Sequence, residues 1–303
     1  MVRTRTLVFC CAAAVLMLVA AGCGSAGGNV GGKPGVVATT VQVGALAKAV
    51  AGGAVSIKTL VGTGVDPHDY EASADDIRTI GDSKLVLRNG IGLDAFLDKA
   101  VAGSGQKNVV TVTGGVKIRK GEQAGSKEDD PHVWHNPEND KIMVDNIARA
   151  LSAAFPANAP TFQRNADAYK KRLDDVDAEI RKLIDTLPAG NRTMVTNHDA
   201  FGYFIERYGL EFVGAVIPNV STAAEASARQ IADLEDTIRR KKVRAVFAES
   251  SLDPKVAKQI ARDTGVKIVD DLYGDSLGPP GSGADTVDGM LLANAKTIVD
   301  ALR

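Results

Sequence analysis

Cysteine is scarce in this chain and absent from the part that we expect to fold. The sequence has three cysteines, Cys10, Cys11 and Cys23, and none after them. The folded part therefore lacks the thiols needed for a disulfide framework, a cysteine-rich zinc site or a cysteine nucleophile. Any metal site in it must be built from imidazole and carboxylate groups.

Aromatic residues and net charge are also low. Aromatic side chains make up 5% of the 303 residues, and the formal net charge is −1. Such a chain offers few stacking surfaces for bases and little attraction for phosphates, which argues against nucleic acid as a partner. The apolar fraction of 45% is that of an ordinary globular protein, with room for one large domain or two of ordinary size.

The N-terminal segment has the pattern of a targeting signal. A basic stretch with Arg3 and Arg5 precedes an apolar run from Leu7 to Ala20, which is too short to span a bilayer comfortably. This pattern predicts a secretory signal peptide over residues 1–22.

The signal ends in Ala20-Ala21-Gly22-Cys23, which resembles a bacterial lipobox with Ala where Leu is commonest. We expect Cys23 to be acylated and to anchor the protein at the extracytoplasmic face of the cell membrane through lipid alone. The alternative is cleavage that leaves Cys23 unmodified. Residues 23–35 are rich in glycine and predict a flexible tether. Removing Arg3 and Arg5 from the 36 basic residues leaves 34 against 37 acidic ones, a net charge of −3.

Beyond the tether, short β-branched runs alternate with amphipathic segments, which is typical of α/β structure. Two helix starts are predicted, at Ser73 with Asp76 three residues on, and at Thr222 with Glu225 three residues on. The predicted strands are Val36–Val43, Val55–Leu60, Lys84–Arg88, Asn108–Val112, Thr193–Thr196, Glu211–Ile217, Val243–Ala248 and Val266–Val269.

One amphipathic segment is much longer than the others. Over residues 161–187 the apolar residues recur at alternating intervals of four and three, which gives one narrow stripe on a helix. A helix of about 26 residues is roughly 39 Å long, more than a simple crossover needs. We interpret it as a linking helix between an N-terminal α/β lobe (36–160) and a C-terminal α/β lobe (188–303), with about four strands in each. The alternative is a long core helix or a coiled-coil arm.

The chain has four histidines, His68, His132, His135 and His198, each beside Asp or Pro, or close to them, where a strand or loop should end. Neutral imidazole is the commonest protein ligand of transition metals. In open α/β sheets ligands bind beyond the carboxyl ends of the strands, where three of these histidines can converge. Their spacing alone does not establish a site, because more than sixty residues separate the three contexts.

Five motifs, in order along the chain, resemble one family: the zinc- and manganese-binding substrate receptors of bacterial metal ABC transporters. The resemblance runs from about Val36 to Arg303. It implies two pseudo-symmetric α/β lobes, each with a central, mainly parallel four-stranded sheet, joined by one long spine helix. The motifs are Gly64-Val65-Asp66-Pro67-His68-Asp69-Tyr70-Glu71, Asp130-Pro131-His132-Val133-Trp134, His198-Asp199-Ala200-Phe201-Gly202-Tyr203-Phe204, Phe247-Ala248-Glu249-Ser250 and Tyr273-Gly274-Asp275-Ser276-Leu277-Gly278.

Carried over residue by residue, the resemblance implies that His68, His132, His198 and Asp275 are the metal ligands. Manganese-type relatives have Glu in place of His198. Three imidazoles and one carboxylate suit tetrahedral Zn²⁺, whereas Mn²⁺ prefers more oxygen ligands. We therefore expect Zn²⁺ as the bound ion, with Mn²⁺ as the alternative. The long histidine-rich loop of many zinc-specific relatives is missing, because the segment 119–129 is short and has no histidine.

Four further residues are expected around the ligands. His135 is an alternative ligand or a neighbour of the site, because it lies three residues after His132. The family pattern places Glu249 as a buried carboxylate near the ligands. Asp66 and Asp199 either orient His68 and His198 or cap helices.

The resemblance implies a monomeric, non-enzymatic receptor that delivers metal to a membrane permease of an ABC importer. Two other functions are alternatives. A zinc hydrolase would need water in the fourth ligand position and Glu249 as its base. A surface adhesin is compatible with the anchor and tether, but no residue requires it.

Overall fold

The computed structural model describes residues 35–121, 128–223 and 225–303. The predicted signal peptide, Cys23 and most of the tether lie outside these residues. One compact unit spans Lys33–Arg303, and the description below concerns it alone. Within the described residues no helix is long and apolar enough to cross a membrane.

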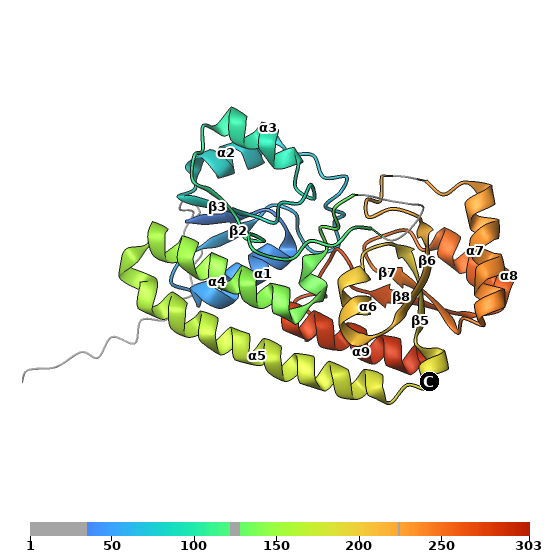
Figure 1. The fold of residues 1–303 in the computed structure, drawn as a ribbon. Coiled ribbons are helices and arrows are strands. Elements are labelled where there is room, and N and C mark those ends of the chain that lie inside the picture. Colours follow the sequence, from blue (N-terminus) through green and yellow to red (C-terminus); the bar gives the residue numbers. More distant parts are fainter. Residues whose placement is uncertain (1–34, 122–127, 224) are drawn as a thin grey trace, which may run out of the picture. The chain divides into compact units, whose positions relative to one another are not determined.

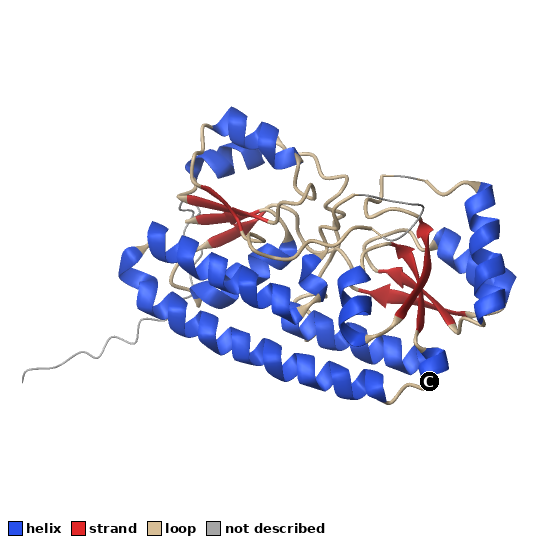
Figure 2. Cartoon of the chain, viewed as in Figure 1, coloured by secondary structure: helices blue, strands red, loops and turns tan. Residues whose placement is uncertain are grey.

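Two four-stranded sheets form the framework (Figures 1 and 2). Every strand pairing is parallel. The strand orders are β2-β1-β3-β4 and β6-β5-β7-β8, so each sheet has the order second, first, third, fourth along its part of the chain. The strands are β1 (Val36–Ala38), β2 (Ile57–Thr59), β3 (Leu85–Arg88), β4 (Val109–Thr111), β5 (Thr193–His198), β6 (Glu211–Ile217), β7 (Ala245–Glu249) and β8 (Lys267–Leu272).

Helices cover both sheets (Figure 2). We call the first sheet with α1–α4 the N-lobe and the second sheet with α6–α9 the C-lobe. The predicted fold of two α/β lobes with parallel four-stranded sheets is confirmed, and so is their repeated topology. The helices are α1 (Val41–Ala51), α2 (Ala74–Asp82), α3 (Phe96–Ser104), α4 (Pro137–Ala154), α5 (Ala159–Asp185), α6 (Gly202–Tyr208), α7 (Ala228–Lys241), α8 (Lys255–Thr264) and α9 (Val287–Leu302), with short 3-10 turns η1 (Val133–His135), η2 (Pro156–Asn158) and η3 (Ala189–Asn191).

Helix α5 is the predicted linking helix. It has 27 residues and runs along both lobes, packed against α4 and α9 (Figure 1). Most of the expected stripe, beginning at Phe162, is buried; Val176 and Leu183 are only partly buried, and Ile184 is buried as well. The observed helix begins and ends two residues earlier than predicted. The lobe limits of 36–160 and 188–303 stay predictions.

The two lobes share one hydrophobic core. Its buried residues include Val36 of β1, Phe162 of α5, Met194 of β5 and Leu291 of α9. Smaller clusters lie under α2 and α3 in the N-lobe and under α7 and α8 in the C-lobe. Because close-packed interiors resist deformation, this shared core opposes wide separation of the lobes.

Two local predictions were wrong. The strand predicted over Val36–Val43 ends at Ala38, because Thr40 caps helix α1 and its side chain accepts a hydrogen bond from the backbone N–H of Val43. The helix start predicted at Thr222 is also wrong: α7 begins at Ala228.

Helix α7 starts there because Ser227 and Gln230 form the capping box instead. The hydroxyl of Thr222 donates to Asp66 of the N-lobe. The start predicted at Ser73 is confirmed, since Ser73 and Asp76 make a capping box at the beginning of α2.

Candidate metal centre

Three imidazoles and one carboxylate meet between the two sheets. The ligand atoms of His68, His132, His198 and Asp275 all lie within 4.8 Å of one another. The Nε2 of His132 is 3.3 Å from the Nε2 of His68 and 3.3 Å from that of His198. The carboxylate oxygens of Asp275 lie 3.2–3.3 Å from all three Nε2 atoms.

These separations fit a small divalent ion. Four ligands at the usual Zn–N distance around a tetrahedral centre are about 3.3 Å apart. The carboxylate of Asp275 is buried, and its two oxygens face the three Nε2 atoms. A buried anion ringed by three imidazole nitrogens is a site that a cation completes.

The parallel sheets bring these residues together. His198 is the last residue of β5, and Asp275 lies three residues after the end of β8. His132 comes immediately before η1, and His68 lies in the loop between β2 and α2. The site therefore receives two residues from each lobe, and the C-lobe pair follows the carboxyl ends of its strands, as expected for an α/β fold.

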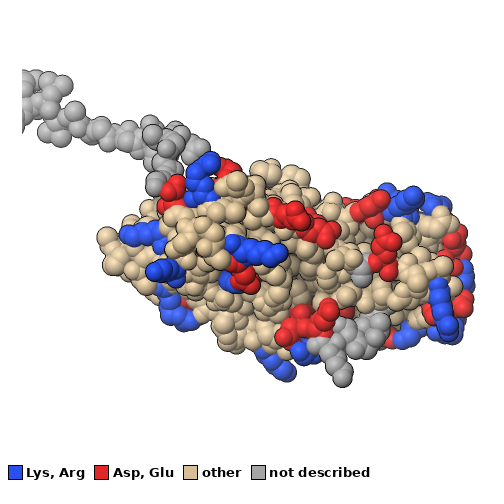
Figure 3. Space-filling model, turned by 90° about the horizontal axis from the view of Figure 1, so that it is seen from above, with Lys and Arg blue, Asp and Glu red and all other residues tan. Residues whose placement is uncertain are grey.

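His68 differs from the other three residues in its exposure. Its side chain is 6% exposed, whereas those of His132, His198 and Asp275 are fully buried. His68 also lines a cavity of about 500 Å³ between the lobes, together with Gly92, Leu93, Pro131, Val220 and Ser221 among others. Figure 3 views the molecule from above, where acidic side chains flank a hollowed and mostly uncharged middle.

A carboxylate orients the ring of His132. The Nδ1 of His132 lies 2.7 Å from Oδ1 of Asp130, which also accepts the backbone N–H of His132. Arg119 donates to the other oxygen of Asp130 at 2.6 Å. This contact holds the Nδ1 edge of the ring at Asp130, so that Nε2 points to the other three residues of the cluster.

A second carboxylate, that of Glu249, orients the ring of His198. The Nδ1 of His198 lies 2.5 Å from Oε1 of Glu249, the last residue of β7. The other oxygen of Glu249 accepts the backbone N–H of Asp275 at 3.2 Å. Gly274 is required beside it, because a Cβ at that position would lie 1.7 Å from this oxygen.

Burial and charge act against each other on the pKa values of this cluster. Burial lowers the pKa of His132, but the charges of Asp275 and Asp130 outweigh it and raise the pKa to about 9. For His198 burial is likewise outweighed by Glu249 and Asp275, and its pKa is raised. Burial raises the pKa of Asp275, yet the facing histidines hold it well below its usual range. In the absence of metal the cluster therefore holds protons that a metal ion must displace.

His135 lies outside the group of four. Its ring is buried and stacks against Phe201 at a centroid distance of 4.6 Å. Burial, followed by the charge of His132, lowers its pKa to about 3. The structure thus places His135 as a neutral ring packed behind the site.

Asp66 and Asp199 make backbone contacts beside the histidines. Oδ1 of Asp66 accepts the backbone N–H of His68 at 2.8 Å. The backbone N–H of Asp199 donates to the carbonyl of Asn219, which ties the end of β5 to the loop after β6. The carboxylate that faces the ring of His198 is Glu249.

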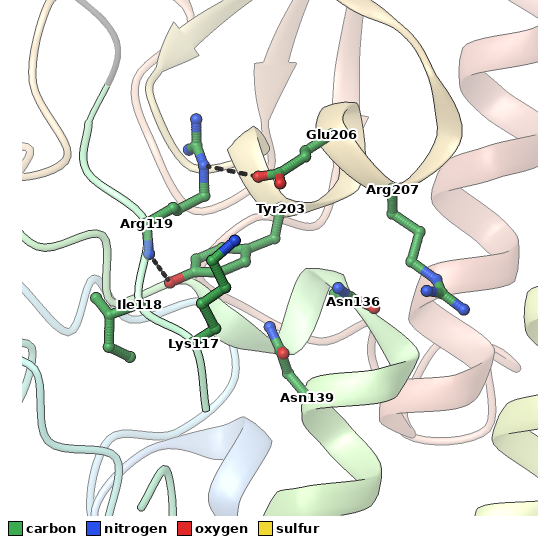
Figure 4. Close-up of a pocket in the computed structure, with 8 residues that line it drawn as sticks. All are labelled: Lys117, Ile118, Arg119, Asn136, Asn139, Tyr203, Glu206 and Arg207. Carbon is green, nitrogen blue, oxygen red and sulfur yellow. Dashed lines mark hydrogen bonds and ion pairs between the residues drawn. The ribbon is translucent and has the colours of Figure 1, made fainter. Parts of the chain in front are cut away.

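Arg119 was missed in the sequence because no motif marks it. Besides Asp130, it reaches the C-lobe: its backbone N–H donates to the hydroxyl of Tyr203, and its side chain lies 3.8 Å from Glu206 (Figure 4). Helix α6 makes room for the guanidinium at Gly202, where a Cβ would lie 1.4 Å from it. The cavity in Figure 4, of about 500 Å³, lies beside Arg119, and its lining includes none of the four clustered residues.

Comparison with known proteins agrees with this geometry. Residues 36–301 match the family model described as zinc-uptake complex component A, periplasmic. The chain belongs to this family. The family consists of transport components and not of enzymes, so the predicted receptor of a metal ABC importer is confirmed at the level of the family.

Relatives with known names differ in the metal that they are named for. The chain is 36% identical over 277 residues to the zinc-binding protein TroA of Treponema pallidum, covering 89% of each chain. It is 35% identical over 291 residues to the manganese-binding lipoprotein MntA of Bacillus subtilis, covering 93% of this chain and 94% of the relative. The solved structure of TroA from Treponema pallidum superposes with a TM-score of 0.82 at 34% identity, over 89% of this chain and 99% of that one.

The raised histidine pKa values predict how the metal-free protein responds to pH. The protonated form of His132 is favoured by the fold, because its folded-state pKa of about 9 exceeds the ~6.5 of an unfolded chain. This stabilisation is fully present below pH ~6.5 and is lost as the pH rises through about 9. The melting temperature of chelator-treated protein should therefore fall over this interval.

The variant Asp130→Asn should flatten that fall, because it removes the charge that faces Nδ1 of His132. Thermal melts of both proteins at several pH values give the comparison. Equal slopes in the two proteins would contradict the assignment of the shift to Asp130.

Proposed function

We propose that this chain is the high-affinity extracytoplasmic receptor of an ABC importer, with Zn²⁺ as its cargo, and that His68, His132, His198 and Asp275 are the ligands. The observation that carries the proposal is the convergence of three Nε2 atoms on one buried carboxylate. His132 and His198, the two fully buried imidazoles of this group, each also have a carboxylate at Nδ1, an arrangement that raises the basicity of a zinc-bound histidine.

The donor set favours zinc over manganese. Three imidazole nitrogens and one carboxylate form a borderline set that suits Zn²⁺, whereas Mn²⁺ prefers oxygen ligands. Relatives named for zinc and for manganese are similarly distant from this chain, so the choice rests on the ligands themselves. The choice between the two metals depends on His198, because a carboxylate at this position would give a set of two nitrogen and two oxygen ligands.

A zinc hydrolase fits the site less well. Asp275 takes the fourth ligand position, where a hydrolase would bind its water. Glu249 faces the Nδ1 edge of His198, on the side of the ring away from the clustered Nε2 atoms, and also accepts from the backbone of Asp275. It is therefore a positioning residue and not a base aimed at a metal-bound water.

Delivery requires a partner in the membrane. We infer that the receptor, a monomer tethered by an acylated Cys23, hands its ion to the permease of the importer. Two relatives are named as metal-binding or metal-transporter lipoproteins, which supports the anchor.

Alanine substitution of a ligand tests the assignment of the site. His68→Ala, His132→Ala and His198→Ala should each weaken zinc binding by at least ~10–100-fold, the loss typical even of residues that only support ligands. His135→Ala is the matched control, because this ring is buried beside the site but packs against Phe201. Competition with a chromogenic zinc chelator measures the affinities, and an equal loss in His135→Ala would show that the wrong histidine was assigned.

Exchange of His198 tests the choice of metal. His198→Glu should lower the affinity for Zn²⁺ relative to Mn²⁺ by about tenfold or more, ~1.4 kcal/mol, because a third imidazole becomes an oxygen ligand. Competitive titration of the two metals against the purified protein, with metal analysis of the product, measures the ratio. An unchanged ratio would show that this position does not set the preference.

Removal of the predicted acylation site tests the anchor. Cys23→Ala should move the protein from the membrane fraction into the soluble extracytoplasmic fraction, because lipid is its only proposed attachment. Zinc affinity of the purified variant should match that of the wild type, since the residue precedes the folded unit. Retention of the variant in the membrane fraction would contradict lipid anchoring at Cys23.

A further inference from the structure

The segment that carries His68 is joined to the C-lobe by specific polar contacts. Residues 60–73, which we call the His68 loop, contain only turns and bends between β2 and α2. Within the part of the chain that the structure describes, two hydrogen bonds join this loop to the C-lobe, besides the contact of the His68 ring with Asp275. The hydroxyl of Thr222 donates to Oδ2 of Asp66 at 2.7 Å, and the backbone N–H of Gly64 donates to Oγ of Ser276 at 2.7 Å.

Asp66 links one of these contacts directly to His68. Its Oδ2 accepts from Thr222, and its Oδ1 accepts the backbone N–H of His68 at 2.8 Å. A single carboxylate therefore connects the C-lobe loop after β6 to the backbone of a ligand residue in the N-lobe. Loss of the hydrogen bond from Thr222 would therefore leave Asp66, and with it the backbone of His68, less constrained.

The other three clustered residues are supported inside the molecule. His132 is held by Asp130, and His198 by Glu249. The loop that carries Asp275 is held by the indole N–H of Trp134, which donates to the carbonyl of Gly274 at 3.0 Å. The residues that give this support, Asp130, Glu249 and Trp134, are all buried in the core.

The exposed side of the site coincides with the His68 loop. His68 is the member of the group that retains exposure, and it lines the cavity of about 500 Å³ between the lobes. Ser221, the neighbour of Thr222, lines the same cavity. An ion that enters or leaves through this cavity passes His68, while the shared core keeps the lobes from separating widely.

We propose that Asp66 and Thr222 form a latch between the lobes that holds His68 at the site and sets the rate at which bound metal leaves. The proposal rests on the proposed function of the four-residue site. Neither residue is assigned as a metal ligand; both act by positioning His68. Breaking the latch lets the His68 loop move outward, which removes one ligand and opens the site towards the cavity.

The rate of zinc release tests the latch. Thr222→Val removes the donor and keeps the branched shape of the side chain. Zinc-loaded protein is mixed with excess chromogenic chelator, and release is followed by absorbance in a stopped-flow instrument. A partly exposed hydrogen bond of this kind should change the release rate about three- to tenfold. The affinity should fall by the same factor, with the association rate unchanged.

Two variants serve as controls. Thr222→Ser keeps the hydroxyl and should release zinc at a rate close to that of the wild type. Thr237→Val makes the same chemical change on α7, where the hydroxyl donates to the helix carbonyl of Asp233 and accepts from Arg240, and should leave release unchanged. Fast release in both Thr222→Val and Thr222→Ser would show that the hydroxyl is not what holds the loop.

A double-mutant cycle separates the latch from a general loosening of the loop. Asp66→Ala alone should speed release, and Thr222→Val added to it should have no further effect, because its partner is already gone. Equal acceleration by Thr222→Val in both backgrounds, or no acceleration in either, would overturn the proposal. Failure of the wild-type chain to bind Zn²⁺ or Mn²⁺ would instead overturn the proposed function, so the two failures are distinguishable.

Discussion

The meeting of one buried carboxylate with three imidazoles is the interaction on which the site of this protein depends. Asp275 and His198 come from the C-lobe, and His68 and His132 from the N-lobe. Burying the charge of Asp275 without a partner would be costly, and the raised pKa values of His132 and His198 offset that cost, because both rings keep a proton when no metal is bound. A divalent cation would displace these protons and neutralise the same carboxylate in their place.

This arrangement requires the two lobes to be placed accurately. Atoms of His68, His132, His198 and Asp275 that lie 3.2–3.3 Å apart across the two lobes tolerate little relative movement. Helix α5, the continuous core from β1 to α9, and the buried bond from Trp134 to Gly274 all join the lobes near or beneath the site. The rigid part of the molecule therefore holds three of the four clustered residues, and the remaining freedom that we propose lies in the loop that carries His68.

Much of the fold was predictable because its signals are local and repeated. Alternating strands and helices gave the α/β class, and the long stripe from Phe162 onward gave the linking helix. The errors occurred where a tertiary contact outweighs a local pattern. Val41 and Val43 favour a strand, yet they lie in α1 because Thr40 caps it and the helix packs on the sheet. Thr222 resembles a helix cap, but its hydroxyl is used by Asp66, 156 residues away in the chain.

By itself the sequence determined which chemistry was available: no thiol beyond Cys23, four histidines, and motifs that resemble one receptor family. It could rank His135 below the other histidines, but it could not place its ring. Only the tertiary structure decided that His135 packs on Phe201, that Glu249 faces the ring of His198, and that Arg119 supports Asp130. The physical reason is that each of these contacts joins residues on different strands, helices or loops, whose separation is set by the packing of the whole core and not by any spacing along the chain.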